Sequence, residues 1–412
     1  MASLLIKNIK QLVGCSNPLK PLRGIELSNL EIIEDAYLIV EDDEIVEFGL
    51  MDDFKNKPGF TKIFDAFGKY VLPTWCDSHT HTVFPTTREE EFIDKLKGLT
   101  YAEIATNGGG ILNSARKLSI ASEEELFNSA WKRLEQMKLL GTGAVEIKSG
   151  YGLSVESEMK MLRVIQKLKE KSSLQIKSTF LGAHTFPIEF KEDHQGYIDL
   201  IINEMLPIIA KDKLADYIDV FCETGFFSAV ETETICKAGM SYGLKPKIHA
   251  NQLNLSGGTQ VGVKLGAISV DHLESMDDET IQILAQSNTI GTLLPTAAYF
   301  LRMPFQPARK LIDANCAIAL ATDYNPGSSP SGNMNIVVSM SCIQMKMLPE
   351  EAINAATING AFAMELNNEV GSITIGKKAN FIITKPINSL AYLPYSFGEN
   401  LIESVYINGI KA

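Results

Sequence analysis

The sequence has few of the features that mark secreted or membrane proteins. Its six cysteines are scattered without a C-x-x-C pair, which in a chain of 412 residues is typical of reduced, mostly buried thiols. No apolar run approaches the ~18 residues that a membrane span needs. Near the N-terminus only a three-residue apolar run, Leu4–Ile6, precedes the first charge, so we expect no secretory signal. These absences predict a cytoplasmic protein with no membrane contact.

Positive charge is also scarce. Lys and Arg total 38 against 50 Asp and Glu, which gives a formal net charge of −12, and no basic cluster stands out. This argues against nucleic acid and an anionic membrane surface as partners, although one basic residue can still hold a small anion. The apolar fraction of 45% and charged fraction of 21% are ordinary for a globular chain and exclude disordered and fibrous classes. The expected partner is a small molecule.

The order of the apolar stretches predicts an α/β fold. From Val71 onwards, continuous apolar runs of strand length alternate with amphipathic helical stretches, as in parallel strands buried on both faces. Eight such units over about 290 residues fit a (β/α)8 TIM-type barrel, although a doubly wound open sheet also holds eight strands. The predicted strands end near Cys76, Ile147, Leu181, Cys222, His249, Asp271, Leu294 and Thr322, and the predicted helices include Glu123–Leu140, Glu156–Lys171, Tyr197–Ala210 and Ser228–Tyr242.

Both ends of the chain have a different pattern. Short alternating stretches at 4–6, 36–40 and 44–48 predict antiparallel strands, and Glu403–Ile407 followed by Asn408-Gly409 predicts a strand and a hairpin turn. We expect the two ends to form one discontinuous β-sandwich domain, over 1–70 and 366–412, beside a barrel domain over 71–365.

Histidines collect at the predicted strand ends. Of only six in the chain, His79 and His81 follow the first strand, His249 ends the fifth and His272 follows the sixth, while Asp323 follows the eighth. Active sites of barrels lie at the carboxyl ends of their strands, so we expect these side chains to converge. Residues two apart in an extended segment share a face, so the two imidazoles of the H-x-H motif can face one ion.

Three imidazoles and one carboxylate form an N3O ligand set. His79, His81, His249 and Asp323 suit one divalent or trivalent ion, zinc or iron, with an open water position. Water on such an ion ionises near neutral pH and attacks carbonyl or amidine carbons, and we expect His272 and Asp323 to manage protons. Another strand-end residue, Lys148, is either a carboxylated bridge to a second metal or an ordinary charged residue.

Further polar residues are predicted on the same face. Arg88 offers a bidentate fork for a substrate carboxylate, Tyr151 sits in a turn after the second strand, His184 follows the third, and Gln252 lies three residues beyond the fifth-strand histidine. Each also has a structural interpretation, such as a surface ion pair for Arg88 or packing for Tyr151. The run Asn107–Gly110 lacks the Gly-Lys-Ser/Thr that cradles phosphate, so we exclude a P-loop.

Over about residues 70–365 the sequence resembles the amidohydrolase superfamily, and within it the imidazolonepropionase family. The resemblance implies a metal-bearing barrel with a sandwich from both termini, a homodimer, and hydrolysis of 4-imidazolone-5-propanoate to N-formimidoyl-L-glutamate by opening of a cyclic amide bond. It is carried by Asp77–His81 with Arg88, and by Gly108–Leu112, Lys148–Leu153, Phe180–His184, Asp219–Glu223 and Ala321–Ser328.

The resemblance also implies roles for single residues. It gives the metal ligands as His79, His81, His249 and Asp323, and the substrate contacts as Arg88, Tyr151, His184, Gln252, Asn325, Gly327 and Ser328. Arg88 is the expected partner of the propanoate carboxylate.

The chain departs from the family pattern at two places and is informative at a third. Pro85–Thr87 stands where the family often has Gly-Gly-Ser, and Tyr324 where it often has Cys, which affects the expected loop shape. Related deaminases use a glutamate at the position of Gln252, and an amide cannot transfer protons in that way. Gln252 therefore favours lactam opening and a binding role.

Two alternatives remain open at this point. One is another cyclic amidohydrolase, or an aminohydrolase, on the same scaffold. If its substrate had no carboxylate, replacing Arg88 would not change its activity. The other is a non-catalytic scaffold or ligand-binding relative, which is disfavoured because all the expected metal ligands are present.

Overall fold

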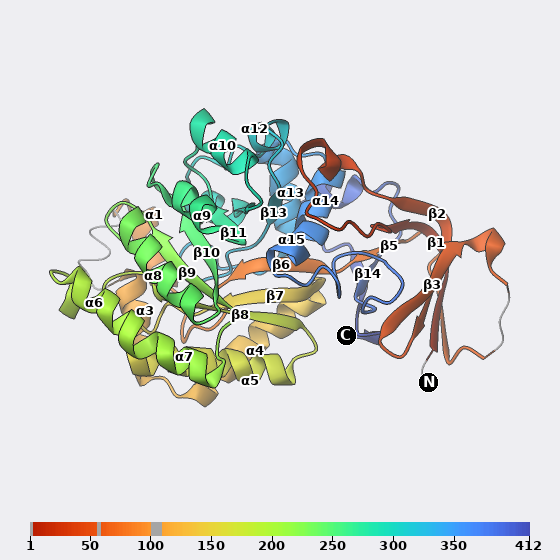
Figure 1. The fold of residues 1–412 in the computed structure, drawn as a ribbon. Coiled ribbons are helices and arrows are strands. Elements are labelled where there is room, and N and C mark those ends of the chain that lie inside the picture. The colour runs from red at the N-terminus through yellow and green to blue at the C-terminus, as the bar shows by residue number, and fades with distance from the viewer. Residues whose placement is uncertain (1–2, 56–58, 100–108) are drawn as a thin grey trace.

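The computed structural model of this chain describes residues 3–55, 59–99 and 109–412 (Figure 1). Met1 and Ala2, part of the segment searched for a secretory signal, lie outside the described residues, as do Asn107 and Gly108 of the glycine run. All six cysteines are free thiols. Within the described ranges, no helix has both the length and the apolar character needed to cross a membrane.

Eight parallel strands form the barrel. Their spatial order follows the sequence from β6 to β13, and backbone bonds join the first and last strands: Asp323 N donates to the His79 carbonyl (3.0 Å), and His81 N to the Tyr324 carbonyl (2.9 Å). The predicted barrel is confirmed, and the open sheet is excluded. The strands are β6 (Trp75–Thr80), β7 (Thr142–Lys148), β8 (Gln175–Ala183), β9 (Tyr217–Cys222), β10 (Lys245–Ala250), β11 (Ser269–His272), β12 (Ile290–Leu293) and β13 (Ile318–Leu320).

Helices surround the barrel (Figure 1). α4 illustrates why they form: Ser122 and Glu125 make a capping box at its start, and its buried residues recur every three or four positions to give one apolar stripe. The helices following β6 to β13 are α1 (Glu89–Leu96), α3 (Gly110–Ile120), α4 (Glu123–Leu139), α5 (Val155–Lys171), α6 (His194–Leu200), α7 (Leu206–Asp212), α8 (Ala229–Ser241), α9 (Gly258–Leu265), α10 (Asp278–Ala285), α11 (Pro295–Leu301), α12 (Ala308–Asp313), α13 (Met334–Met345), α14 (Pro349–Ala356) and α15 (Ile358–Ala363).

One predicted helix is interrupted. Instead of a single α-helix over Tyr197–Ala210, the chain forms α6, a π-helical turn at Ile201–Met205, and α7. Pro207 lies in the first turn of α7. It has no N–H, and its ring clashes with the carbonyl four residues earlier. A widened turn relieves that clash, which hydrophobic periodicity cannot reveal.

Strands from both termini form a second, mixed sheet (Figure 1). The start of the edge strand β3 is bonded to the segment that leads into β14, because Ile45 N donates to the Lys377 carbonyl and Ala379 N to the Asp43 carbonyl. The sheet has an apolar core of its own. The division into 1–70 plus 366–412 and 71–365 stays a prediction; the strand pairing puts the junction at Thr74, between β5 and β6. The strands are β1 (Ser3–Val13), β2 (Ile32–Glu41), β3 (Glu44–Leu50), β4 (Lys62–Asp65), β5 (Tyr70–Pro73), β14 (Phe381–Thr384), β15 (Ile402–Ile407) and β16 (Ile410–Lys411).

Candidate active site

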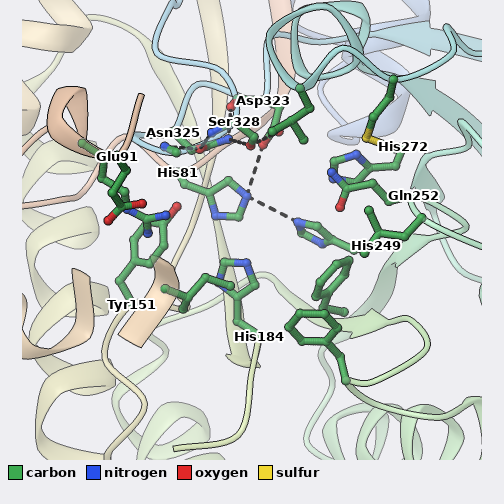
Figure 2. Close-up of a pocket in the computed structure, with 18 of the residues that line it drawn as sticks. His81, Glu91, Tyr151, His184, His249, Gln252, His272, Asp323, Asn325 and Ser328 are labelled. Atoms are coloured by element: carbon green, nitrogen blue, oxygen red, sulfur yellow. Dashed lines mark hydrogen bonds and ion pairs between the residues drawn. The ribbon is translucent and has the colours of Figure 1, made fainter. Parts of the chain in front are cut away.

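The predicted metal ligands meet at the carboxyl ends of β6, β10 and β13, and Figure 2 shows three of them, His81, His249 and Asp323. His81 Nε2 lies 3.4 Å from His249 Nε2 and 3.5 Å from Asp323 Oδ1, and His79 Nε2 lies 3.6 Å from the same oxygen. Ligand bonds of about 2.0–2.2 Å place the ligand atoms of a tetrahedral site roughly 3.3–3.6 Å apart. Three pairs of ligand atoms therefore have the spacing that one ion requires. The ligand atoms of His79, His81 and His249 lie within 4.8 Å of one another, and so do those of His79, His272 and Asp323.

The protonation states of these imidazoles also fit a metal ion. Burial, reinforced by neighbouring positive charges, holds the pKa values of His79, His81 and His249 well below the usual range, so the rings are neutral, as metal ligands must be. His79 Nε2 is buried with no hydrogen-bond partner among the described residues. An unsatisfied buried acceptor costs about 1–3 kcal/mol, and a cation at this point would satisfy it.

Two aspartates orient the ligand histidines from behind. Asp271 Oδ2 lies 2.7 Å from His79 Nδ1, and Asp219 Oδ2 lies 2.8 Å from His249 Nδ1 while its Oδ1 accepts the His249 backbone N–H at 3.0 Å. A carboxylate at Nδ1 fixes the tautomer that leaves Nε2 unprotonated. His79 thus presents Nε2 to Asp323 Oδ1 at 3.6 Å, and His249 presents Nε2 to His81 Nε2 at 3.4 Å.

Lys148 lies beneath these aspartates and is fully buried. It donates to Glu146 Oε1 at 2.6 Å and to Asp219 Oδ2 at 2.8 Å, and lies 3.4 Å from Asp271 Oδ2. Burial alone lowers the pKa of Lys148, but the three carboxylates outweigh it and raise the pKa above the ordinary lysine value. A protonated ammonium has no lone pair for carboxylation, so the geometry favours the charged residue over the bridge to a second metal.

His272 and Asp323 form a pair of titratable groups beside the ligand cluster. Burial lowers the pKa of His272. Glu274, whose Oε1 lies 3.4 Å from His272 Nδ1, and the carboxylates of Asp323 and Asp271 raise it, and together they outweigh burial, so the net shift is upward. Burial raises the pKa of the Asp323 carboxyl to about 6. Both residues have left-handed backbone, with φ of 88° and 53°, a strain that is typical of functional sites. The ligand atoms of the two residues lie within 4.8 Å of each other.

A cavity of about 380 Å³ opens in front of the cluster, within the size range of small-molecule sites. Figure 2 shows Tyr151 and His184 on one side of it and Gln252 and His272 on another. Every residue predicted to contact substrate lines this cavity, although their roles stay predictions: Arg88, Tyr151, His184, Gln252, Asn325, Gly327 and Ser328.

Arg88 is held without a carboxylate partner. Its Nε and Nη2 donate to Ser114 Oγ at 2.9 and 2.7 Å, and its Cζ lies 5.6 Å from the centre of the Tyr151 ring. A Cβ on Gly327 would lie 2.5 Å from Arg88 Nη1, so a larger residue at this position would displace the guanidinium. No acidic side chain of the described residues lies within 4.0 Å of it, which leaves this cation available for an anionic ligand.

The loop that carries Tyr151 is fixed by a buried carboxylate. Glu158 accepts backbone N–H bonds from Gly150, Gly152 and Leu153, and the Gly150 carbonyl lies 2.9 Å from His184 Nδ1. Gly150 has φ of 108°, and a Cβ there would lie 2.9 Å from that same nitrogen. A glycine is therefore needed for Tyr151 and His184 to share one wall of the cavity.

Asn325 shapes the loop after β13. Its Oδ1 accepts N–H bonds from Gly327 and Ser328, both at 2.8 Å, and its Nδ2 donates to the Asp323 carbonyl at 2.7 Å. Ser328 Oγ lies 3.3 Å from Asp323 Oδ2. Tyr324, which stands where the family often has Cys, packs edge-on against Phe84 with ring centres 6.2 Å apart. This departure from the family pattern therefore affects the packing behind the loop.

Sequence reasoning missed several charged residues at the site. It gave no role to Asp219, Asp271, Glu146 or Glu274. The available signal was their charge within or beside apolar, buried strands, because a buried charge must be paired. It also missed Lys95, which lines the cavity and donates to the Gly327 carbonyl at 3.3 Å. Lys95 lies seven residues after Arg88, two helical turns along the same face.

The chain is similar to known proteins over nearly its whole length. It is 57% identical over 406 residues to the imidazolonepropionase of Flavobacterium johnsoniae, covering 98% of each chain, and 56% identical over 411 residues to that of Christiangramia forsetii, covering 99% of each. A model of the amidohydrolase family matches residues 225–411. The crystal structure of an adenosine deaminase from Xanthomonas campestris with bound zinc shares the fold, with a TM-score of 0.73 at 16% identity over 100% of this chain and 92% of that one. This chain therefore belongs to the imidazolonepropionases, a family of amidohydrolases whose members hydrolyse a cyclic amide bond.

Proposed function

We propose that the chain hydrolyses 4-imidazolone-5-propanoate to N-formimidoyl-L-glutamate, a step of histidine degradation, with one metal ion held by His79, His81, His249 and Asp323. The main support is the spacing of the ligand atoms, 3.4–3.6 Å for His81–His249, His81–Asp323 and His79–Asp323, beside a cavity that Arg88 lines. When bound, such an ion polarises the ring carbonyl and lowers the pKa of a water molecule.

The chain's own residues would bind and orient the substrate. Arg88 would bind the propanoate carboxylate through its free donors, since a guanidinium matches that group bidentately. Tyr151 and His184, 5.5 Å apart between ring centres, would form one wall against which the flat heterocycle packs. Gln252 would hydrogen-bond a polar atom of the ring without moving a proton, which suits ring opening better than deamination.

Proton transfer would fall to Asp323 and His272. Hydrolysis adds water across the carbonyl carbon–nitrogen bond, so the attacking water must lose a proton and the departing ring nitrogen must gain one. Asp323, with its pKa raised to about 6 by burial, would take the first proton. His272, whose pKa Glu274 raises, would supply the second.

Three finer points belong to the same proposal. Imidazole and carboxylate ligands suit zinc and ferrous iron alike, so the ion is either one, and elemental analysis of purified protein distinguishes them. The homodimer implied by the family resemblance and the cytoplasmic location stay predictions. Light scattering on purified protein tests the first, and cell fractionation tests the second.

The test compares two histidine variants. We expect His79→Ala to lose both the ion and turnover while circular dichroism shows an unchanged fold. His194→Ala, at an exposed position on α6, should retain both. Substrate disappearance is followed with freshly made imidazolonepropanoate, and hydantoin and cytosine serve as alternative substrates for the competing hydrolase and deaminase functions. Full activity in metal-free His79→Ala, or a preference for either alternative, would overturn the proposal.

A further inference from the structure

Charged side chains are buried together beneath the proposed metal ligands. Glu146 and Lys148 on β7, Asp219 on β9, Lys247 on β10 and Asp271 on β11 all have fully buried side chains. Removing one partner of a buried ion pair is strongly destabilising, whereas apolar residues of similar volume are often as good for stability. A need for simple packing therefore does not explain five charges at this position.

The arrangement links two metal ligands through one ammonium group. Lys148 Nζ lies 2.8 Å from Asp219 Oδ2 and 3.4 Å from Asp271 Oδ2. These same two oxygens lie 2.8 Å from His249 Nδ1 and 2.7 Å from His79 Nδ1. Both histidines, although they come from strands β6 and β10, are thus oriented by carboxylates that share one cation.

We propose that Lys148 is a positioning residue that holds Asp219 and Asp271 in place and thereby fixes the orientation of both histidine ligands. The inference rests on the metal site proposed above. Without the ammonium group, the two carboxylates would face each other in a water-free interior, where like charges repel strongly. They would turn away from the imidazoles, or one would become protonated, and in either case a histidine would lose its acceptor.

The lysine is itself held by neighbouring strands. Its third partner, Glu146 Oε1, also accepts a hydrogen bond from Thr179 Oγ1 on β8 at 2.6 Å. The second oxygen of Glu146 pairs with Lys247, whose other acceptors are the carbonyls of Ser78 and Ala363. Lys247 thus shares Glu146 with Lys148. Its backbone pairs with Asp219 and its charge lowers the pKa of Asp271, but among the described residues its ammonium forms no ion pair within 4.0 Å with either aspartate. It is therefore the control for loss of a buried ammonium group without loss of an ion pair to the aspartates.

The test measures metal affinity of Lys148→Met and Lys247→Met by competition with a chromophoric chelator, together with the absorption spectrum of the cobalt-substituted proteins. Disturbing one carboxylate behind a metal-bound histidine typically costs about 10–100-fold in affinity. Because Lys148 serves two, we expect Lys148→Met to lose at least ~10²-fold and to change the cobalt spectrum. We expect Lys247→Met to stay within about tenfold. Equal losses in both variants, or a loss below threefold in Lys148→Met, would overturn the inference.

A second comparison covers the case in which Lys148→Met does not fold. The double variant K148M/D271N removes one charge of each sign from the buried cluster, and it is compared with D271N alone. Through Asp219, the lysine substitution should weaken metal binding by a further ~10-fold or more; no further loss would contradict the proposal. If wild-type protein binds no metal, the proposed function fails, whereas normal wild-type binding with unaffected Lys148 variants refutes only this inference.

Discussion

Replacing Arg88 by methionine tests the carboxylate site most directly. The guanidinium is partly exposed and has Ser114 as its hydrogen-bond partner among the described side chains. A hydrogen bond between charged groups contributes about 1.5–3 kcal/mol. For a bidentate pair at a partly exposed position we take roughly 3 kcal/mol, which corresponds to about a 10²-fold loss in kcat/KM because 1.36 kcal/mol is a factor of ten.

The structure also predicts how this variant behaves without substrate. Arg88 has no acidic partner in the described part of the chain, so its removal breaks no ion pair. Arg88→Met should therefore unfold at the same urea concentration as wild type or a higher one, as is common where a functional group is kept at a cost in stability. A large drop in the urea midpoint would indicate a structural role instead.

The assay compares two substrates. Initial rates are measured for imidazolonepropanoate and for its side-chain amide, which has the same ring without the negative charge. Wild type should prefer the acid by about 10²-fold, and Arg88→Met should lose this preference. Arg88→Lys should retain part of it, because a lysine keeps the charge but not the fork. An undiminished preference in Arg88→Met would refute the assignment.

The remaining predictions concern stability and binding. In the metal-free protein, the free energy of unfolding should fall as the pH drops below about 6.5, by up to ~4 kcal/mol per pH unit. The reason is that His79, His81 and His249 have lowered pKa values in the folded state and take up protons on unfolding. A free energy of urea unfolding that does not change between pH 5 and 7 would contradict this. Glu158→Ala should cost about 3–5 kcal/mol in urea unfolding, because three buried N–H groups lose their acceptor; a loss under 1 kcal/mol would speak against that role. Gln252→Ala should raise KM about tenfold with kcat nearly unchanged, and a collapse of kcat would indicate that this side chain takes part in the chemical step.

The barrel, and the convergence of the predicted ligands at one end of it, were predictable because both follow from short-range sequence patterns. Apolar runs identified every barrel strand, and the rule that active sites lie at carboxyl ends selected His79, His81, His249 and Asp323 from sequence alone. Three of the four predicted helices match within one residue at each end. The fourth fails because Pro207 changes the helix geometry locally.

The supporting residues were not predictable, because they depend on the register between strands. The alternation of side chains puts Lys148 and Asp219 inside the barrel, but only the alignment of neighbouring strands brings them together. In the structure His249 lies opposite Asp271 on β11 and Phe221 on β9. A shift of one residue would turn every inward charge outward. The identity of the ion was likewise unreadable, since the donor atoms suit two metals.

The closure of the barrel gives the proposed ligand set a second consequence. His79 and His81 end the first strand, Asp323 follows the last, and two backbone hydrogen bonds join them across the seam, aided by Asp77, which accepts from Thr322 N and Oγ1 at 2.9 and 2.7 Å. Any ion bound by these three ligands would connect the first and last strands of the barrel. Metal binding should therefore stabilise a seam that hydrogen bonds already close, and amide hydrogen exchange along this seam should slow when the ion is added.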